Sequence, residues 1–367
     1  MKVALVHDWG NQVGGAERVL LALKEMFPDA PVYMSIYEPA VMPAVCRTWD
    51  IRTSFMDRLP LVKRHHQPFL PLYPLAFEQF DFSDFELVIS NKSGFCHGII
   101  TPPETLHISY CLTPTRYVWD YRSYARREGI GRLVNAFLQP LLTCLRAWDR
   151  LAADRVDHFV AISREVQRRI RKYYRRDSTV IYPPVEVDRF TSVADQDDFF
   201  LIVSRLIPYK RIDLAVEAFN ALRLPLKIVG DGRDRLALER MAGSTIEILG
   251  RVPDSEMQTL LQRCRAFVFP GDEDFGIAPL EANAAGRPVI AYRAGGALDT
   301  VVEGKTGLFF DEPTPESLAA AVRALEGMTF DPDSIRQHAL RFDKTVFRRE
   351  LMCFVEQKHA EHKDRLR

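Results

Sequence analysis

Short apolar segments alternate with helix-like segments along this chain, and the alternation occurs in two successive series. Residues 3–6 form the first strand-like segment, and residues 16–27 follow with apolar side chains at helical spacing. A second series begins at residue 199 with F-F-L-I-V-S. Strands that alternate with helices run parallel, because each helix returns the chain to the same end of the sheet. The sequence therefore predicts an α/β protein with two parallel sheets.

The length of the chain agrees with two domains. With 367 residues, the chain exceeds the usual size of one domain. We predict a first domain at 1–190 and a second at 198–345. The string P-P-V-E-V-D-R-F-T-S-V-A-D-Q-D-D forms the expected linker, and a terminal helix is expected at about 346–367.

A glycine-rich turn follows the first predicted strand. It spans residues 7–15 and includes Gly14 and Gly15, directly before the helix-like segment. Such a turn lets backbone N–H groups approach a phosphate closely. The turn lacks the G-x-G-x-x-G spacing of nicotinamide and flavin sites. An ordinary turn between a strand and a helix is the alternative.

Two cations follow the first strand of the second series. In S-R-L-I-P-Y-K, Arg205 comes directly after the strand, and Lys210 begins the next expected helix. Arginine offers a rigid fork for phosphate oxygens, and lysine offers a point charge. The two residues predict a diphosphate site without a metal, and two solvated cations are the alternative.

Two carboxylates follow a later strand, in A-F-V-F-P-G-D-E-D-F-G-I-A-P-L-E. Glu273 lies in the loop, and Glu281 falls in the first turn of a helix that Pro279 is expected to start. Both carboxylates then face the carboxyl end of the strand, where open α/β sheets bind ligands. Asp272 and Asp274 form a D-x-D pattern, so a Mn²⁺ or Mg²⁺ site is the alternative.

Together these segments resemble the retaining GT-B glycosyltransferases of family 4. The strings G-G-A-E-R-V, S-R-L-I-P-Y-K and the E-x7-E segment match that family in the expected order, and the resemblance extends from residue 3 to about 347. The string T-P-T-R-Y-V-W-D also resembles a signature of bacterial mannosyltransferases that build O-antigen and exopolysaccharide. This chain has Leu112 where that signature usually has histidine, which puts an acid/base or orienting role of this position in doubt.

The resemblance implies two Rossmann-like domains facing a cleft, with the C-terminal helix crossing back to the first domain. It implies transfer of a sugar from a nucleotide sugar, with GDP-mannose favoured, to a hydroxyl of a growing, lipid-linked bacterial surface glycan. The reaction retains the anomeric configuration and needs no metal or other cofactor. A non-catalytic nucleotide-sugar-binding protein and a GT-B nucleotide-sugar 2-epimerase are the alternatives.

The resemblance also implies roles for individual residues. Arg205 and Lys210 neutralise the leaving diphosphate, Glu273 holds sugar hydroxyls as the third catalytic residue, and Glu281 binds the ribose. The other donor-binding residues implied are Gly14, Gly15, Gly230, Arg251, Val252, Phe275, Gly276, Ile277 and Ala278. The acceptor-side or orienting residues implied are Ser93, Arg116 and Tyr117.

Charge is balanced over the whole chain but not along it. Lys+Arg and Asp+Glu both number 49. The chain therefore lacks the excess of positive charge that would indicate a nucleic-acid partner. Residues 116–176 hold 15 basic and 6 acidic residues, and the chain also has an aromatic, proline-rich segment at 58–82 and an apolar stripe at 133–151. These features predict docking on an anionic membrane surface; a packed core seam and a solvated charged face are the alternatives. The basic residues of this hypothesis are Arg122, Arg126, Arg127, Arg132, Arg168, Arg169 and Lys172.

The sequence also bears on location. Six cysteines show no metal-ligand spacing, which is typical of reduced thiols in the cytosol. Met1-Lys2 leads directly into a strand-like segment, without the apolar region of a signal peptide. No apolar run reaches the ~18 residues of a spanning helix. We therefore expect a cytoplasmic protein that is peripheral on the inner face of the membrane.

Overall fold

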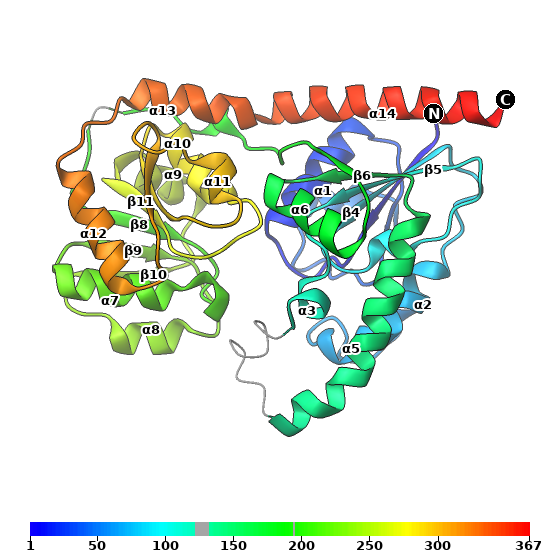
Figure 1. The fold of residues 1–367 in the computed structure, drawn as a ribbon, viewed down its shortest axis with the longest axis horizontal. Coiled ribbons are helices and arrows are strands. Elements are labelled where there is room, and N and C mark those ends of the chain that lie inside the picture. The colour runs from blue at the N-terminus through cyan, green and yellow to red at the C-terminus, as the bar shows by residue number, and fades with distance from the viewer. Residues whose placement is uncertain (122–131, 194) are drawn as a thin grey trace. The chain divides into compact units, whose positions relative to one another are not determined.

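The computed structural model describes residues 1–121, 132–193 and 195–367, and only the backbone of 132–137 (Figure 1). The chain divides into two compact units. Unit 1 comprises Met1–Pro184 and Phe347–Arg367, and unit 2 comprises Val185–Val346. Arg122, Arg126 and Arg127 of the membrane hypothesis lie outside the described residues, as does the side chain of Arg132.

In the described part of unit 1, seven parallel strands form a sheet in the order β3-β2-β1-β4-β5-β6-β7. The strands are β1 (Val3–His7), β2 (Val32–Met34), β3 (Ile51–Thr53), β4 (Leu87–Lys92), β5 (Leu106–Cys111), β6 (His158–Ala161) and β7 (Ser178–Val180). Strands β1, β4 and β5 are buried along their whole length, although β4 and β5 also carry polar residues.

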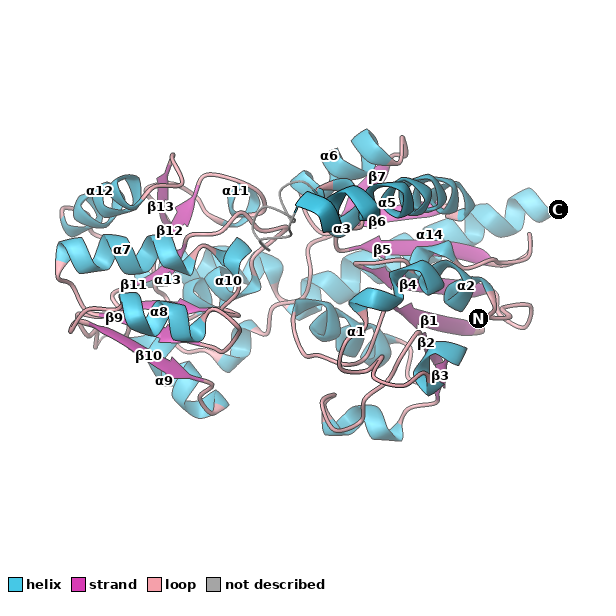
Figure 2. Cartoon of the chain, turned by 90° about the horizontal axis from the view of Figure 1, so that it is seen from below, coloured by secondary structure: helices cyan, strands magenta, loops and turns pink. Residues whose placement is uncertain are grey.

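Helices cover both faces of this sheet (Figure 2). The α-helices are α1 (Gly15–Met26), α2 (Tyr73–Glu78), α3 (Arg116–Trp119), α5 (Arg132–Ala152) and α6 (Arg164–Tyr173). Short 3₁₀ helices occur at Ala44–Thr48, Phe55–Arg58, Gln67–Leu72, Cys96–Gly98 and Ala153–Arg155. Helix α6 begins at a serine N-cap, because the Ser163 hydroxyl accepts a hydrogen bond from the backbone N–H of Val166.

In the described part of unit 2, six parallel strands form a sheet in the order β10-β9-β8-β11-β12-β13. The strands are β8 (Phe200–Val203), β9 (Leu226–Val229), β10 (Ile246–Gly250), β11 (Ala266–Phe269), β12 (Val289–Tyr292) and β13 (Gly307–Phe310). The helices are α7 (Ile212–Leu222), α8 (Arg235–Met241), α9 (Asp254–Arg263), α10 (Ile277–Ala284), α11 (Ala297–Thr300), α12 (Pro315–Glu326) and α13 (Pro332–Ala339). The 3₁₀ helices are Val187–Arg189, Pro208–Lys210 and Leu340–Phe342.

The last helix, α14 (Lys344–Leu366), begins in unit 2, and its residues from Phe347 onward belong to unit 1 (Figure 1). Phe347, Leu351 and Val355 are buried along one side of the helix, and Phe347 packs edge-on against Tyr110 of β5. The prediction of two parallel-sheet Rossmann-like units with a long C-terminal helix is confirmed.

Two features that had suggested a membrane surface are core features of unit 1. Tyr73, Phe77 and Phe82, from the proline-rich segment at 58–82, are almost completely buried in one apolar cluster. Leu145 of α5 is buried in the same cluster, and Trp148 packs against it. The apolar stripe of α5 is therefore a packed seam where it is described, and the aromatic side chains named here are not available to a lipid surface.

Candidate functional site

The strand order of unit 2 creates a topological switch point between β8 and β11. From β8, the chain adds β9 and β10 on one side and β11, β12 and β13 on the other. Open α/β sheets bind ligands beside the carboxyl ends of the two strands at such a point. Arg205 and Lys210 follow β8, and Glu273 follows β11. The topology therefore places the predicted cations and one predicted carboxylate at the same edge of the sheet.

Lys210 and Glu273 are in direct contact at this edge. The Lys210 ammonium forms an ion pair with Glu273 Oε2, and the two side chains are only 13% and 17% exposed. Arg205 Nη2 donates a hydrogen bond to the Tyr209 hydroxyl at 3.0 Å. The Lys210 ammonium also lies 5.2 Å from the centroid of the Tyr209 ring. Tyr209 was not singled out from the sequence, although it lies inside the S-R-L-I-P-Y-K string.

Close backbone contacts fix the loop that carries Glu273. A Cβ on Gly295 would lie 2.2 Å from the Glu273 carbonyl oxygen, and a Cβ on Gly296 would lie 2.2 Å from the Cα of Phe275. The Gly296 N–H donates to the Glu273 carbonyl at 2.8 Å. Only glycine allows this approach, so the glycine pair after β12 holds the loop after β11 in place.

Helix α10 begins earlier than the sequence predicted. Gly276 adopts a left-handed conformation with φ of 102° and forms the N-cap, so the helix starts at Ile277 and not at Pro279. Glu281 therefore lies in the second turn and not in the first. Its side chain is buried, whereas Ile277 and Ala278 at the helix start are partly exposed. Lys210 likewise closes a 3₁₀ helix (Pro208–Lys210), and α7 begins only at Ile212.

The ends of β8, β9 and β10 are also tied together through glycines. Gly230 has a φ of 134°, and its Cβ position lies 1.8 Å from the Ser204 carbonyl oxygen, so no other residue fits there. The Gly230 N–H donates to the Gly250 carbonyl at 2.8 Å. Arg251 and Val252 follow directly, with Arg251 exposed and Val252 partly exposed.

Unit 1 has a comparable switch point between β1 and β4, but an internal carboxylate fills it. Asp8, directly after β1, is completely buried. It accepts hydrogen bonds of 2.6–2.8 Å from four consecutive backbone N–H groups, those of residues 93–96, and one from the Ser93 hydroxyl at 3.1 Å. A row of N–H groups that would suit a phosphate therefore binds the chain's own carboxylate. Asp8 was not predicted as a site residue, because its only signal in the sequence is its place after a buried strand.

The predicted glycines of unit 1 lie beside this cradle in sequence. Gly14 is the N-cap of α1, and Gly15 is its first residue. Glu17, in the first turn, is buried and has Oε1 at 3.4 Å from His7 Nε2. The Asn91 amide lies 3.2 Å from His7 Nδ1 and donates to the Ala16 carbonyl at 2.8 Å. These contacts tie the glycine-rich turn to the end of β4.

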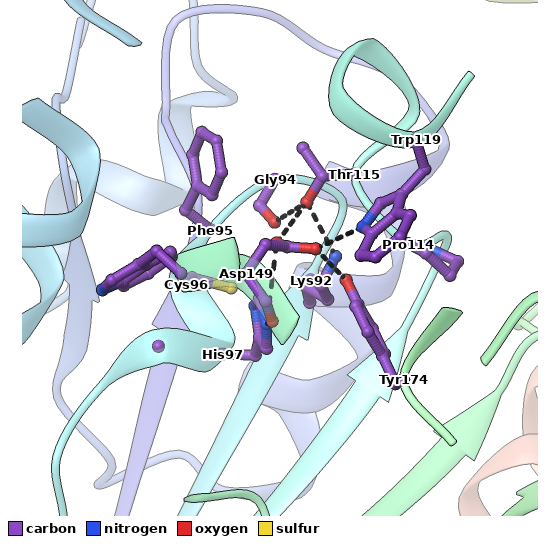
Figure 3. A network of polar contacts seen from close by, with 12 residues as sticks. Lys92, Gly94, Phe95, Cys96, His97, Pro114, Thr115, Trp119, Asp149 and Tyr174 are labelled. Atoms are coloured by element: carbon purple, nitrogen blue, oxygen red, sulfur yellow. Dashed lines mark hydrogen bonds and ion pairs between the residues drawn. The ribbon is translucent and has the colours of Figure 1, made fainter. Parts of the chain in front are cut away.

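The string T-P-T-R-Y-V-W-D is anchored by a buried aspartate on α5 (Figure 3). Asp149 accepts hydrogen bonds from the Trp119 indole at 2.6 Å and from the Tyr174 hydroxyl at 2.7 Å. The Thr115 hydroxyl lies 2.8 Å from Asp149 Oδ1 and 3.1 Å from the ammonium of the buried Lys92. Burial and then the charge of Asp149 raise the pKa of Tyr174 well above its usual range, so the phenol is a neutral donor.

The three predicted acceptor-side residues differ in their surroundings. Ser93 belongs to the Asp8 cradle, and Tyr117 packs edge-on against Phe95 beside the core. Arg116 lines a hollow of about 370 Å³ together with residues of α6. Leu112, at the position where the mannosyltransferase signature has histidine, is buried.

The described ranges 1–121, 132–193 and 195–367 contain neither a metal-like cluster nor a membrane-spanning helix. No three His, Cys, Asp or Glu side chains in them converge as a metal site would require. None of the helices described is long and apolar enough to cross a membrane.

Known proteins resemble both halves of the chain. Residues 13–189 match the family Glycosyltransferase Family 4, and residues 185–340 match Glycosyl transferases group 1. The human alpha-1,3/1,6-mannosyltransferase ALG2 is 25% identical in an alignment 363 residues long, and the alignment covers 84% of this chain and 84% of the relative. A GDP-mannose-dependent alpha-(1-6)-phosphatidylinositol monomannoside mannosyltransferase of Mycolicibacterium smegmatis is 28% identical over 235 residues, covering 54% of this chain and 62% of the relative.

Other matches are shorter or are structural. The chain aligns with about half the length of two further curated glycosyltransferases, 52% and 45%. The crystal structure of Anabaena HepE in complex with UDP-glucose superposes with a TM-score of 0.70 at 16% identity, covering 97% of this chain and all of that one. This likeness establishes the GT-B fold. Because the two family matches together extend from residue 13 to residue 340, the chain belongs to the retaining GT-B glycosyltransferases of family 4.

Proposed function

We propose that unit 2 binds a nucleotide sugar at the carboxyl ends of β8 and β11, and that the protein transfers the sugar to a hydroxyl of a glycan acceptor. The observation that carries this proposal is the Lys210–Glu273 ion pair at the switch point. It places a cation suited to a phosphate beside a carboxylate suited to sugar hydroxyls. Family 4 membership supports the same reaction class.

The reaction develops negative charge on the departing diphosphate. When the donor binds, Lys210 separates from the Glu273 carboxylate and pairs with phosphate oxygens. Arg205 adds a second cation, so the negative charge is stabilised where it forms. Glu273, released from Lys210, accepts hydrogen bonds from the sugar hydroxyls, and Glu281 accepts them from the ribose. The bond between the anomeric carbon and the phosphate oxygen breaks as the acceptor oxygen bonds to that carbon from the same face. The acceptor proton passes to the leaving phosphate oxygen, so no metal and no nucleophilic carboxylate take part.

GDP-mannose is the proposed donor, and a lipid-linked bacterial surface glycan at the cytoplasmic face of the membrane is the proposed acceptor. The string T-P-T-R-Y-V-W-D, which resembles the bacterial mannosyltransferase signature, supports mannose. The human and mycobacterial relatives are both named as mannosyltransferases, and the mycobacterial name specifies GDP-mannose.

A donor panel tests the proposal. Purified full-length protein is incubated separately with GDP-mannose, UDP-glucose, UDP-galactose, UDP-N-acetylglucosamine and dTDP-rhamnose, and the released nucleoside diphosphate is measured. Preferential release of GDP is expected. Preferential release of UDP would contradict mannose transfer and leave glycosyl transfer standing. Release from none of them, with folded protein and added membrane glycolipids, would contradict the enzymatic proposal for these donors.

A further inference from the structure

A basic hollow lies on unit 1 between the T-P-T-R-Y-V-W-D string and helix α6. Its volume is about 370 Å³, within the usual range of small-ligand pockets. Among the described residues, its charged lining has four cations and two carboxylates: Arg116, Arg168, Arg169, Lys172, Asp120 and Glu165. These described side chains carry an excess of two positive charges.

The cations from α6 share one face of that helix. Arg168 and Lys172 are four residues apart, which brings their side chains together on the helix surface. Val166 and Ile170, on the opposite face, are completely buried and fix the rotation of the helix. Glu165 pairs with both Arg168 and Arg169, the latter at 2.9 Å. One carboxylate thus holds two guanidinium groups at the edge of the hollow without cancelling both charges.

The aromatic wall of the hollow is held rigidly. The Trp119 ring stacks on Tyr173 of α6 with centroids 4.8 Å apart and planes 14° apart. The Trp119 indole also donates a hydrogen bond to the buried Asp149. Tyr174, which follows Tyr173 in the chain, donates a hydrogen bond from its hydroxyl to the same carboxylate (Figure 3). Asp149 therefore joins α3 to the end of α6, so the backbone elements that carry the cations are in place before a ligand binds.

We propose that this hollow binds a phosphate-bearing group of the acceptor, an assignment that rests on the proposed function. Guanidinium forks match the oxygens of a phosphate, and the Lys172 ammonium adds a point charge. The same chemistry is offered by a phospholipid headgroup, so the two sources must be separated by experiment. The basic residues on α6, which the sequence analysis assigned to a membrane-facing surface, here line a concave site.

The first test uses inorganic pyrophosphate as the probe and full-length protein saturated with GDP, and in a parallel series with UDP, so that the nucleotide site is filled whether or not the donor panel shows turnover. Calorimetry compares wild type with Lys172→Glu and with Arg171→Glu, which makes the same charge change on an exposed neighbour outside the hollow. Lys172→Glu should weaken binding about tenfold or more, as expected for lost charge-assisted hydrogen bonds. No binding at low salt, or equal weakening in both variants, would overturn the site.

The second test identifies the source of the phosphate. Vesicles of phosphatidylglycerol and of phosphatidylcholine are co-sedimented with the same three proteins. Binding to phosphatidylglycerol that Lys172→Glu weakens and pyrophosphate displaces would assign the hollow to a lipid headgroup and overturn the acceptor assignment. Pyrophosphate binding without vesicle binding supports the acceptor's phosphate. Pyrophosphate binding that depends on Lys172, in a protein without donor turnover, would contradict the proposed function while retaining the phosphate site.

Discussion

At the scale of single residues, Asp8 and Lys210 illustrate two uses of a switch point. In unit 1, Asp8 occupies the switch point between β1 and β4, where its carboxylate accepts hydrogen bonds from four backbone N–H groups. In unit 2, the switch point between β8 and β11 presents the Lys210–Glu273 pair, which retains some exposure to solvent. This difference favours unit 2 as the site of the donor phosphates, because an incoming anion would have to displace Asp8 from the unit 1 cradle.

Asp8→Asn is predicted to destabilise unit 1. The asparagine side chain is neutral, and its NH₂ group faces backbone N–H donors where the aspartate has an acceptor oxygen. Some buried backbone N–H groups of residues 93–96 therefore lose their acceptor. We expect the free energy of unfolding to fall by about 3–5 kcal/mol, typical of a broken buried charge interaction. Urea denaturation measures the change, with the exposed Asp84→Asn as the control. Equal stability of the two variants would contradict the structural role of the cradle.

Activity is predicted to persist in excess EDTA. In the proposed mechanism, Arg205 and Lys210 supply the positive charge that a divalent metal supplies in other transferases, and they do so without a dissociable ligand. Release of the nucleoside diphosphate is measured with EDTA and again after Mn²⁺ or Mg²⁺ is added back. A loss of activity that either metal restores would instead favour Asp272 and Asp274 as metal ligands.

At the scale of elements, strand β5 introduces a dependence of stability on pH. Burial lowers the pKa of His107 to about 3, whereas an unfolded histidine titrates near 6.5. Between these values, the unfolded chain binds one more proton than the folded chain. The contribution of His107 is therefore fully present above the unfolded pKa and is lost as the pH falls toward 3, by up to ~1.4 kcal/mol per pH unit.

His107→Asn is predicted to reduce this slope by about one proton. The free energy of unfolding is measured by urea denaturation at several pH values between 7 and 5 in wild type and variant. The exposed His65→Asn serves as the control and should leave the slope unchanged. A slope in His107→Asn identical to that of wild type would show that His107 does not bind the extra proton on unfolding.

Sequence patterns predicted the first strand of each unit, the helix after β1 and the terminal helix, because buried parallel strands and amphipathic helices differ in the period of their apolar residues. They did not predict where α10 begins, because the left-handed conformation of Gly276 and the close approach of Phe269, 2.9 Å from where a Cβ would lie, arise only in the folded chain. They also did not predict that Tyr73, Phe77 and Phe82, in the segment at 58–82, are buried. This segment is rich in prolines and has no regular period, so nothing local indicated that Tyr73 and Phe77 are buried. The Asp8 cradle depends on residues 85 or more positions away and had no local signature.

At the scale of the whole molecule, α14 completes unit 1 with residues that follow unit 2 in the chain. Besides its buried residues, its Arg348 forms an ion pair with Glu25, and Lys363 Nζ lies 3.1 Å from Glu86 Oε1. These exposed pairs contribute little to stability. The buried face of the helix should therefore dominate its contribution to unit 1.

Leu351→Ala is predicted to reduce the free energy of unfolding of unit 1 by about 2–5 kcal/mol, as for other buried leucines. The exposed Glu356→Ala on the same helix is the control. Hydrogen exchange followed by mass spectrometry localises the effect, and peptides from β5 and from the sheet of unit 1 should lose protection. Loss of protection confined to unit 2 would contradict the assignment of this part of α14 to unit 1.

The proposed transfer reaction depends on Lys210 as the residue that stabilises the departing diphosphate. The most direct measurement is the turnover of the preferred nucleotide sugar at saturating concentration by wild type, Lys210→Ala and Lys305→Ala, which removes an exposed lysine elsewhere in unit 2. Circular dichroism verifies that all three proteins are folded. We predict that Lys210→Ala is slower by about 10²–10³-fold, typical of losing one positioned charge donor, and that Lys305→Ala equals wild type. Turnover by Lys210→Ala at the wild-type rate would contradict the proposed reaction.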